Sequence, residues 1–110
     1  MARLALIEPD RLDEALAGGV VLLDLWRESR RPCHALEPRL AAFVRAHRRE
    51  LRAYRVDVDR DAQTPKRFGV MGLPTVLLLR DGHELARLDG LITDDDLERA
   101  LAHATGTAPT

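Results

Sequence analysis

The sequence predicts an α/β domain in which helices cover a mixed β-sheet. Three observations lead to this fold class. The run Val20–Trp26 is apolar throughout, segments with strand and helix patterns alternate along the chain, and a hairpin around Asp81-Gly82 precedes a last helix.

The first elements are a short strand and a helix. Residues 4–7 read LALI, a short apolar stretch typical of a strand. Residues 8–19 read EPDRLDEALAGG and predict a helix, because Pro9 suits a first helical turn and leucines form an apolar stripe. The two glycines, Gly18 and Gly19, are expected to end it.

A central strand and a long helix follow. Val20–Trp26 lacks alternation and begins with β-branched residues, as expected for a strand covered on both faces. Asp24 lies inside this strand and needs a partner or a proton if it is buried. A helix begins at Pro32, and Pro38 is expected to kink it. Its apolar face is formed by Leu36, Leu40, Phe43, Val44 and His47. Its polar face carries Arg39, Arg45, Arg48, Arg49 and Arg52.

The second half of the chain alternates strand and helix again. Residues 53–59 alternate apolar and charged side chains, which predicts a strand, and residues 61–69 predict a short helix. Residues 75–90 predict a hairpin, because Asp81-Gly82 accepts the positive φ angles of a tight turn. A threonine followed by three acids begins the last helix, over residues 93–104.

Length and composition predict one domain over residues 1–110, with frayed ends at residues 1–3 and 105–110. The formal net charge of −1 gives no field that would draw the protein to nucleic acid or to a membrane. The apolar stretch at residues 4–7 is too short for a signal peptide or a membrane span, which predicts a cytoplasmic protein. One cysteine excludes an internal disulfide and suits a reducing compartment.

Three stretches of the chain resemble the thioredoxin family: LLDLWRESRRPCHALEP, RFGVMGLPTVLLLRDG and LDGLITDDDLERAL. The resemblance runs without gaps from about Gly18 to Arg99. It implies the thioredoxin fold, a central mixed sheet of about five strands flanked by about four helices. It also implies a redox motif at the start of the second helix, in which one cysteine attacks a substrate disulfide and a second cysteine resolves the product.

The resemblance carries over residue by residue, except at the attacking cysteine. The matched positions are Asp24 (the buried acid), Trp26, Pro32, Cys33 (the resolving cysteine), Pro38, Arg55 (often lysine in the family), Pro74 (a cis-proline after Leu73) and Gly90 (at the substrate groove). The family motif Trp-Cys-Gly-Pro-Cys is replaced by Ser-Arg-Arg-Pro-Cys. Arg30 therefore stands where the attacking cysteine should be, and Arg31 where the family has glycine.

The catalytic candidates are Cys33 and Asp24, and each has two interpretations. Cys33 is either a monothiol that exchanges with other thiols or a buried small hydrophobic residue. Asp24 either assists proton transfer to Cys33 or is an inherited acid. We expect Arg55 to hold Asp24 ionised, so that its carboxylate opposes ionisation of the Cys33 thiol. The thiol pKa should then not fall clearly below its usual value of roughly 8.5.

Two functions are compatible with these residues. In the first, the protein is a non-catalytic module, or an assembly or redox-accessory factor, that binds an extended polypeptide along Pro74. Arg30 and Arg31 form a rim that suits an acidic partner, and Pro32 is a further substrate-binding candidate. The apolar groove residues are Trp26, Met71, Leu73, Gly90 and Leu91. In the second, Cys33 exchanges with a thiol-bearing partner or takes up glutathione. Unaided disulfide reduction is not expected, because a guanidinium cannot attack a disulfide. We expect no cofactor, no metal, no nucleic acid and no membrane as partners.

Overall fold

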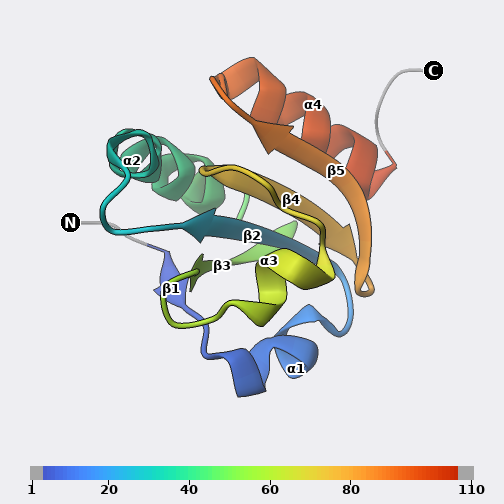
Figure 1. Cartoon of the computed structure of the whole chain (residues 1–110). Helices are drawn as coiled ribbons and strands as arrows, with labels where there is room; N and C mark the ends of the chain where they lie inside the picture. Colours follow the sequence, from blue (N-terminus) through green and yellow to red (C-terminus); the bar gives the residue numbers. More distant parts are fainter. Residues whose placement is uncertain (1–3, 107–110) are drawn as a thin grey trace.

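The computed structural model describes residues 4–106 and contains one five-stranded sheet with the strand order β1-β3-β2-β4-β5 (Figure 1). The elements are β1 (Ala5–Leu6), the 3₁₀ turn η1 (Pro9–Arg11), α1 (Leu12–Leu16), β2 (Val20–Trp26), α2 (Arg31–Ala46), β3 (Leu51–Asp57), α3 (Gln63–Arg67), β4 (Thr75–Arg80), β5 (His83–Asp89) and α4 (Asp94–Thr105). Strand β3 runs parallel to β1 and β2, whereas β4 is antiparallel to both β2 and β5. The predicted α/β fold with a mixed sheet is confirmed.

The helices lie in two layers, with α2 and α4 on one face of the sheet and α1 and α3 on the other (Figure 1). Side chains alternate between the two faces along each strand, so each face has its own apolar cluster. Leu22 and Leu78 pack with Leu40 and Leu97 beneath α2 and α4. Their neighbours on the same strands, such as Leu23 and Leu77, pack beneath α1 and α3 on the opposite face.

Strand β2 is central and buried at all seven positions, as its unbroken apolar pattern predicted. Its even-numbered residues face α2, so Asp24 lies beneath that helix. The hairpin turn also forms as predicted, with φ of 51° at Asp81 and 83° at Gly82.

Helix α2 ends earlier than the arginine pattern suggested. It stops at Ala46, a turn follows, and β3 begins at Leu51 rather than at residue 53. Arg52 therefore lies on a strand and not on the helix. Its guanidinium donates to three backbone carbonyls at the end of α1, those of Ala15, Ala17 and Gly18, at 2.7–3.1 Å. These long-range contacts explain the difference, since helical periodicity alone cannot register them.

The C-terminal helix extends one residue further than expected. Thr93 caps α4 by accepting a hydrogen bond from Asp96 N–H at 3.1 Å, and the Asp96 carboxylate accepts one from Thr93 N–H. The helix includes Thr105 and ends at Gly106, whose φ is 78°. Residues 105 and 106 thus belong to the end of α4, and the other residues expected to fray, 1–3 and 107–110, lie outside the described part. None of the helices within residues 4–106 has the length and apolarity needed to cross a membrane.

His47 ties the end of α2 to α4. Its Nδ1 lies 2.8 Å from Glu50 Oε1 and its Nε2 lies 3.0 Å from Glu98 Oε2. Hydrogen bonds to Glu50 and Glu98 raise the pKa of His47 above its usual value, and partial burial opposes them only in part. The charged imidazole is therefore favoured in the folded protein.

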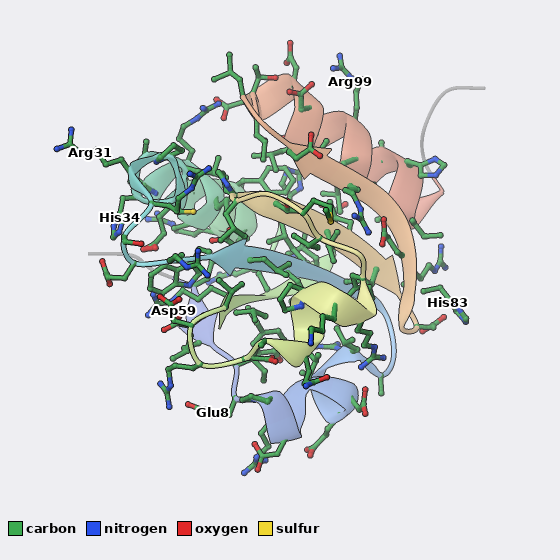
Figure 2. The ribbon with its side chains drawn as sticks, in the orientation of Figure 1. Glu8, Arg31, His34, Asp59, His83 and Arg99 are labelled. Atoms are coloured by element: carbon green, nitrogen blue, oxygen red, sulfur yellow. The ribbon has the colours of Figure 1, made fainter. Side chains whose placement is uncertain are left out.

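The His47→Gln variant is expected to lose stability in acid but not in alkali. A raised pKa means that the stabilisation is complete below the unfolded value of roughly 6.5 and is lost as the pH rises through the folded value. We expect a loss of about 1 kcal/mol in the free energy of unfolding at the acid end, because both carboxylates are half-exposed. Urea unfolding at pH values below and above the pKa of His47 measures this change in the free energy of unfolding. His83→Gln is the control, since His83 is exposed at the hairpin (Figure 2). A loss independent of pH would contradict the interpretation.

Candidate functional site

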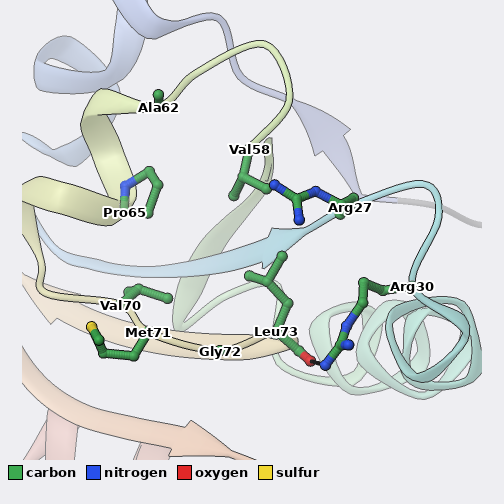
Figure 3. A pocket seen from close by; sticks show the side chains of 9 residues that line it. All are labelled: Arg27, Arg30, Val58, Ala62, Pro65, Val70, Met71, Gly72 and Leu73. Atoms are coloured by element: carbon green, nitrogen blue, oxygen red, sulfur yellow. Dashed lines mark hydrogen bonds between the residues drawn. The ribbon is translucent and has the colours of Figure 1, made fainter.

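The candidate site forms where the end of β2, the start of α2 and the loop before β4 meet. Strand β2 pairs with β4, and the partner of Leu25 is Thr75. This pairing brings the loop after Trp26 next to Leu73 and Pro74, which are joined by a cis peptide bond. Residues from separate parts of the chain, Arg30 and Leu73, are thereby placed side by side (Figure 3).

Arg30 bonds directly to the loop before β4. Its Nη2 donates to the backbone carbonyl of Leu73 at 3.1 Å (Figure 3). The same residue is the N-cap of α2, and its own carbonyl accepts from Cys33 N–H at 3.1 Å. Sequence reasoning placed Arg30 on a rim but missed this contact, because a backbone carbonyl carries no residue-type signal.

Arg31 and Arg30 are exposed cations without an acidic partner. Among residues 4–106, no carboxylate lies within 4.0 Å of either guanidinium, and the first turn of α2 contains no acid. Arg31 extends away from the start of α2 into solvent (Figure 2). Two positive charges thus lie at the positive end of the helix dipole, an arrangement that favours a bound anion.

A pocket of about 380 Å³ opens beside the Arg30–Leu73 contact (Figure 3). It is lined by Arg27, Arg30, Val58, Ala62, Pro65, Val70, Met71, Gly72 and Leu73. Arg27 is held at its edge by an ion pair with Asp59, with Nε and Oδ1 2.9 Å apart. Sequence reasoning found Arg30, Met71 and Leu73. It missed the others, which come from α3, from the segments after β2 and β3, and from the loop before β4, because nothing in the spacing indicated a shared surface.

A second hollow lies on the other side of Pro74. It has a volume of about 140 Å³ and is lined by Pro32, Ala35, Leu36, Arg39, Pro74, Gly90, Leu91 and Ile92. The Leu91 side chain is 88% exposed here, and Met71, at the first pocket, is 97% exposed. The structure therefore brings together the predicted residues Pro32, Pro74, Gly90 and Leu91, and it sets two exposed apolar side chains beside them.

Trp26 does not line either pocket, contrary to its predicted place in the groove. Its side chain is 4% exposed, because it lies on the α2 face of the sheet. The Arg55 guanidinium lies 4.8 Å from the centroid of the Trp26 ring, and the His34 ring meets it edge-on at 6.1 Å.

Cys33 is buried, with 2% of its surface exposed. Burial raises the pKa of the Cys33 thiol, and the acids Asp24 and Glu37 raise it further. A backbone hydrogen bond from Arg27 and the charge of Arg30 oppose the rise without cancelling it. The structure thus favours the buried interpretation of Cys33 over that of an exposed monothiol.

Asp24 is 1% exposed, and burial raises the pKa of its carboxyl from 3.8 to about 7. The nearby Glu37 adds to the rise, and Arg55 only partly opposes it. The prediction that Arg55 holds Asp24 ionised is therefore wrong. Arg55 Nε donates to Leu4 O at 2.9 Å, and within residues 4–106 neither Asp24 Oδ1 nor Arg55 Nη1 has a hydrogen-bond partner.

Glu37 is the buried acid that sequence reasoning missed. It is 7% exposed and lies one turn after Cys33 on α2. Its spacing contained the signal, since residues i and i+4 share a helix face and burial was one of the two interpretations of Cys33. The start of α2 therefore holds a buried thiol with two buried carboxyl groups nearby.

Comparison with known proteins agrees with this geometry. The sequence model of the family described as Thioredoxin matches residues 4–103. A thioredoxin of Pseudomonas aeruginosa is 33% identical over 85 residues, covering 77% of this chain and 79% of that protein. A thioredoxin of Chlamydia muridarum is 31% identical over 97 residues, covering 88% and 94%. The solved structure of a mutant thioredoxin from Halobacterium salinarum NRC-1 superposes with a TM-score of 0.82 at 28% identity, covering 96% and 93%. The chain therefore belongs to the thioredoxin family.

Proposed function

We propose that this protein is a cytoplasmic polypeptide-binding member of its family that does not carry out dithiol–disulfide exchange by itself. The observation that carries the proposal is the Arg30–Leu73 hydrogen bond at 3.1 Å. At the position of the attacking thiol, the protein has a side chain that bonds to the loop before β4. That side chain cannot form a mixed disulfide.

The remaining thiol is poorly suited to start an exchange reaction. Attack on a disulfide requires an accessible thiolate. Cys33 is 2% exposed and its pKa is raised, so both requirements are met poorly at neutral pH. Its burial instead supports a packing role at the start of α2.

The surface around Pro74 retains what polypeptide binding needs. Leu73 N–H has no hydrogen-bond partner within residues 4–106, which leaves a donor for a strand-like segment. Met71 and Leu91 offer apolar contacts at the two pockets, and both are almost fully exposed. Large exposed apolar side chains gathered near a groove are typical of a protein-binding surface.

Monothiol exchange through Cys33 is the second candidate, and Asp24 is the observation that favours it. A carboxyl with a pKa of about 7 is half-ionised at neutral pH and can accept the proton of a nearby thiol. In that case a partner disulfide must reach a buried sulfur, and loss of Cys33 abolishes capture of the partner.

Binding can be tested with a panel of cysteine-free synthetic peptides and isothermal titration calorimetry. Met71→Asp and Leu91→Asp are each expected to lower the affinity for the bound peptides by about tenfold. Each substitution replaces a central apolar contact with a charge that loses its water on binding. Cys33→Ser is expected to bind as the natural protein does. Leu85→Asp is the matched control, since Leu85 is an exposed apolar residue on β5 outside both pockets.

Three outcomes would overturn the proposal. The first is that no peptide of the panel binds to the protein. The second is that Leu85→Asp lowers peptide affinity as much as Met71→Asp and Leu91→Asp do. The third is loss of binding in Cys33→Ser, which would favour monothiol exchange if mass spectrometry also shows a mixed disulfide with glutathione on the natural protein.

A further inference from the structure

The Arg30–Leu73 contact uses an acceptor that a strand-like partner would need. A segment that adds to the backbone at Leu73 pairs with both its N–H and its carbonyl oxygen. The N–H is available, but the carbonyl already accepts from Arg30 Nη2 at 3.1 Å. An incoming polypeptide must therefore move the guanidinium before it can complete the pairing.

Within residues 4–106, Arg30 makes no ion pair that could hold it once it leaves the Leu73 carbonyl. No carboxylate of residues 4–106 lies within 4.0 Å of Arg30. The neighbouring arginines at the two pockets already have acids, since Arg27 pairs with Asp59 at 2.9 Å and Arg39 with Asp94 at 3.1 Å. A charged group that loses its hydrogen bond at a protein interface is costly unless the partner replaces that bond.

The positive charge around Arg30 indicates which partner group can replace its lost hydrogen bond. Arg30 and Arg31 are exposed at the positive end of α2, and the first turn of that helix has no acid. A guanidinium presents two parallel N–H groups, which match the two oxygens of a carboxylate. A carboxylate of the partner can therefore accept from Arg30 at the moment the Leu73 carbonyl is released.

We propose that Arg30 is a displaceable latch that makes the site selective for extended polypeptides carrying a carboxylate side chain beside the segment paired with Leu73. In the free protein the latch occupies the Leu73 carbonyl. In the complex the partner backbone donates to that carbonyl and the partner carboxylate accepts from Arg30. This inference rests on the proposed function, because it concerns the same surface.

The pocket beside Arg30 indicates a second feature of the partner, an apolar side chain. Away from its two arginines, its walls are mainly apolar, with Val58, Val70 and Met71 among them. Its volume of about 380 Å³ accommodates a large apolar side chain. The favoured segment therefore has an apolar residue close to its acidic one.

Three cysteine-free peptides of one sequence, with Glu, Gln or Lys at a single position next to an apolar residue, test the latch. We expect the natural protein to bind the Glu peptide about tenfold more tightly than the Gln peptide, because a charge-assisted hydrogen bond replaces the one that is lost. The Lys peptide should bind most weakly. The Glu preference should shrink as salt is added.

Arg30→Met is the decisive variant, since it keeps the length of the side chain and removes both the charge and the donors. It should bind the Glu peptide more weakly than the natural protein and the Gln peptide more tightly, because the Leu73 carbonyl is then open. Arg45→Met is the matched control, an exposed arginine in the last turn of the same helix. A ¹³C label at the Leu73 carbonyl should shift on Arg30→Met substitution and on addition of the Glu peptide.

The outcomes separate this inference from the proposed function. Equal affinity for the Glu and Gln peptides, with binding still lost in Leu91→Asp, would overturn the latch and leave polypeptide binding in place. An acid preference that Arg45→Met reduces as much as Arg30→Met would also overturn it, since general surface charge would explain the result. Absence of binding by all three peptides and by the wider panel would overturn the proposed function itself.

Discussion

The Arg30→Cys variant is expected to reduce insulin disulfides at least about tenfold faster than the natural protein, which should stay near the uncatalysed rate. A thiol at this position lies at the N-terminus of α2, where free N–H groups and the charge of Arg31 lower its pKa. Residues 30 and 33 are already held in one turn, since Cys33 N–H donates to Arg30 O at 3.1 Å. Asp24, with a pKa of about 7, can take the proton of Cys33 when that thiol resolves the mixed disulfide.

Two further variants show whether the added sulfur causes the gain. Arg30→Ser removes the guanidinium without supplying a thiol and should remain at the uncatalysed rate. Arg30→Cys with Cys33→Ser should form a lasting mixed disulfide with the substrate but turn it over poorly, because the resolving thiol is missing. Equal turnover by the natural protein and Arg30→Cys would contradict our account of the site, and so would an inactive Arg30→Cys variant that folds normally.

The Asp24→Asn variant is expected to remove a pH-dependent loss of stability that reaches about 4 kcal/mol, since each pKa unit corresponds to about 1.4 kcal/mol. Between pH 3.8 and about 7 the folded protein keeps the Asp24 proton and the unfolded chain releases it. The unfolded chain therefore binds fewer protons, and the free energy of unfolding falls as the pH rises. Above about pH 7 the full cost of a buried carboxylate is present.

Urea unfolding of both proteins, from about pH 4 to about pH 8, measures this difference. The gain of Asp24→Asn over the natural protein should grow with pH and level off at the alkaline end. Asp10→Asn is a suitable control, because Asp10 is an exposed carboxyl on η1. A constant difference between Asp24→Asn and the natural protein across the range would show that Asp24 is not buried as a neutral acid.

The features that sequence predicted well depend on neighbours in the chain. The unbroken apolar run Val20–Trp26 indicated a central strand, and Asp81-Gly82 indicated a tight turn, because both signals are local. The α4 cap at Thr93 is of the same kind. Each of these signals lies within a few residues of the chain.

The features that sequence missed depend on contacts between distant segments. Arg52 leaves the predicted helix because its guanidinium finds carbonyls at the end of α1. Arg55 lies over the Trp26 ring and bonds to Leu4 O, so it neutralises Asp24 less than its place in the motif suggested. The Arg30–Leu73 bond joins residues 43 positions apart. Motif spacing located these positions, but tertiary packing decided what each side chain does there.

The packing around Trp26 gives the molecule a built-in optical reporter. The chain has a single tryptophan, so its emission arises from one place. That indole is buried at the end of β2, just before the loop that carries Arg30, with the Arg55 cation over its ring and the His34 imidazole at its edge. Both neighbours influence the excited state of the ring. The His34 ring also contacts the loop, with Nε2 2.6 Å from Glu28 O, so a rearrangement of the loop would change its position at the indole. Events at the start of α2 can therefore be followed in the unlabelled protein by its intrinsic fluorescence.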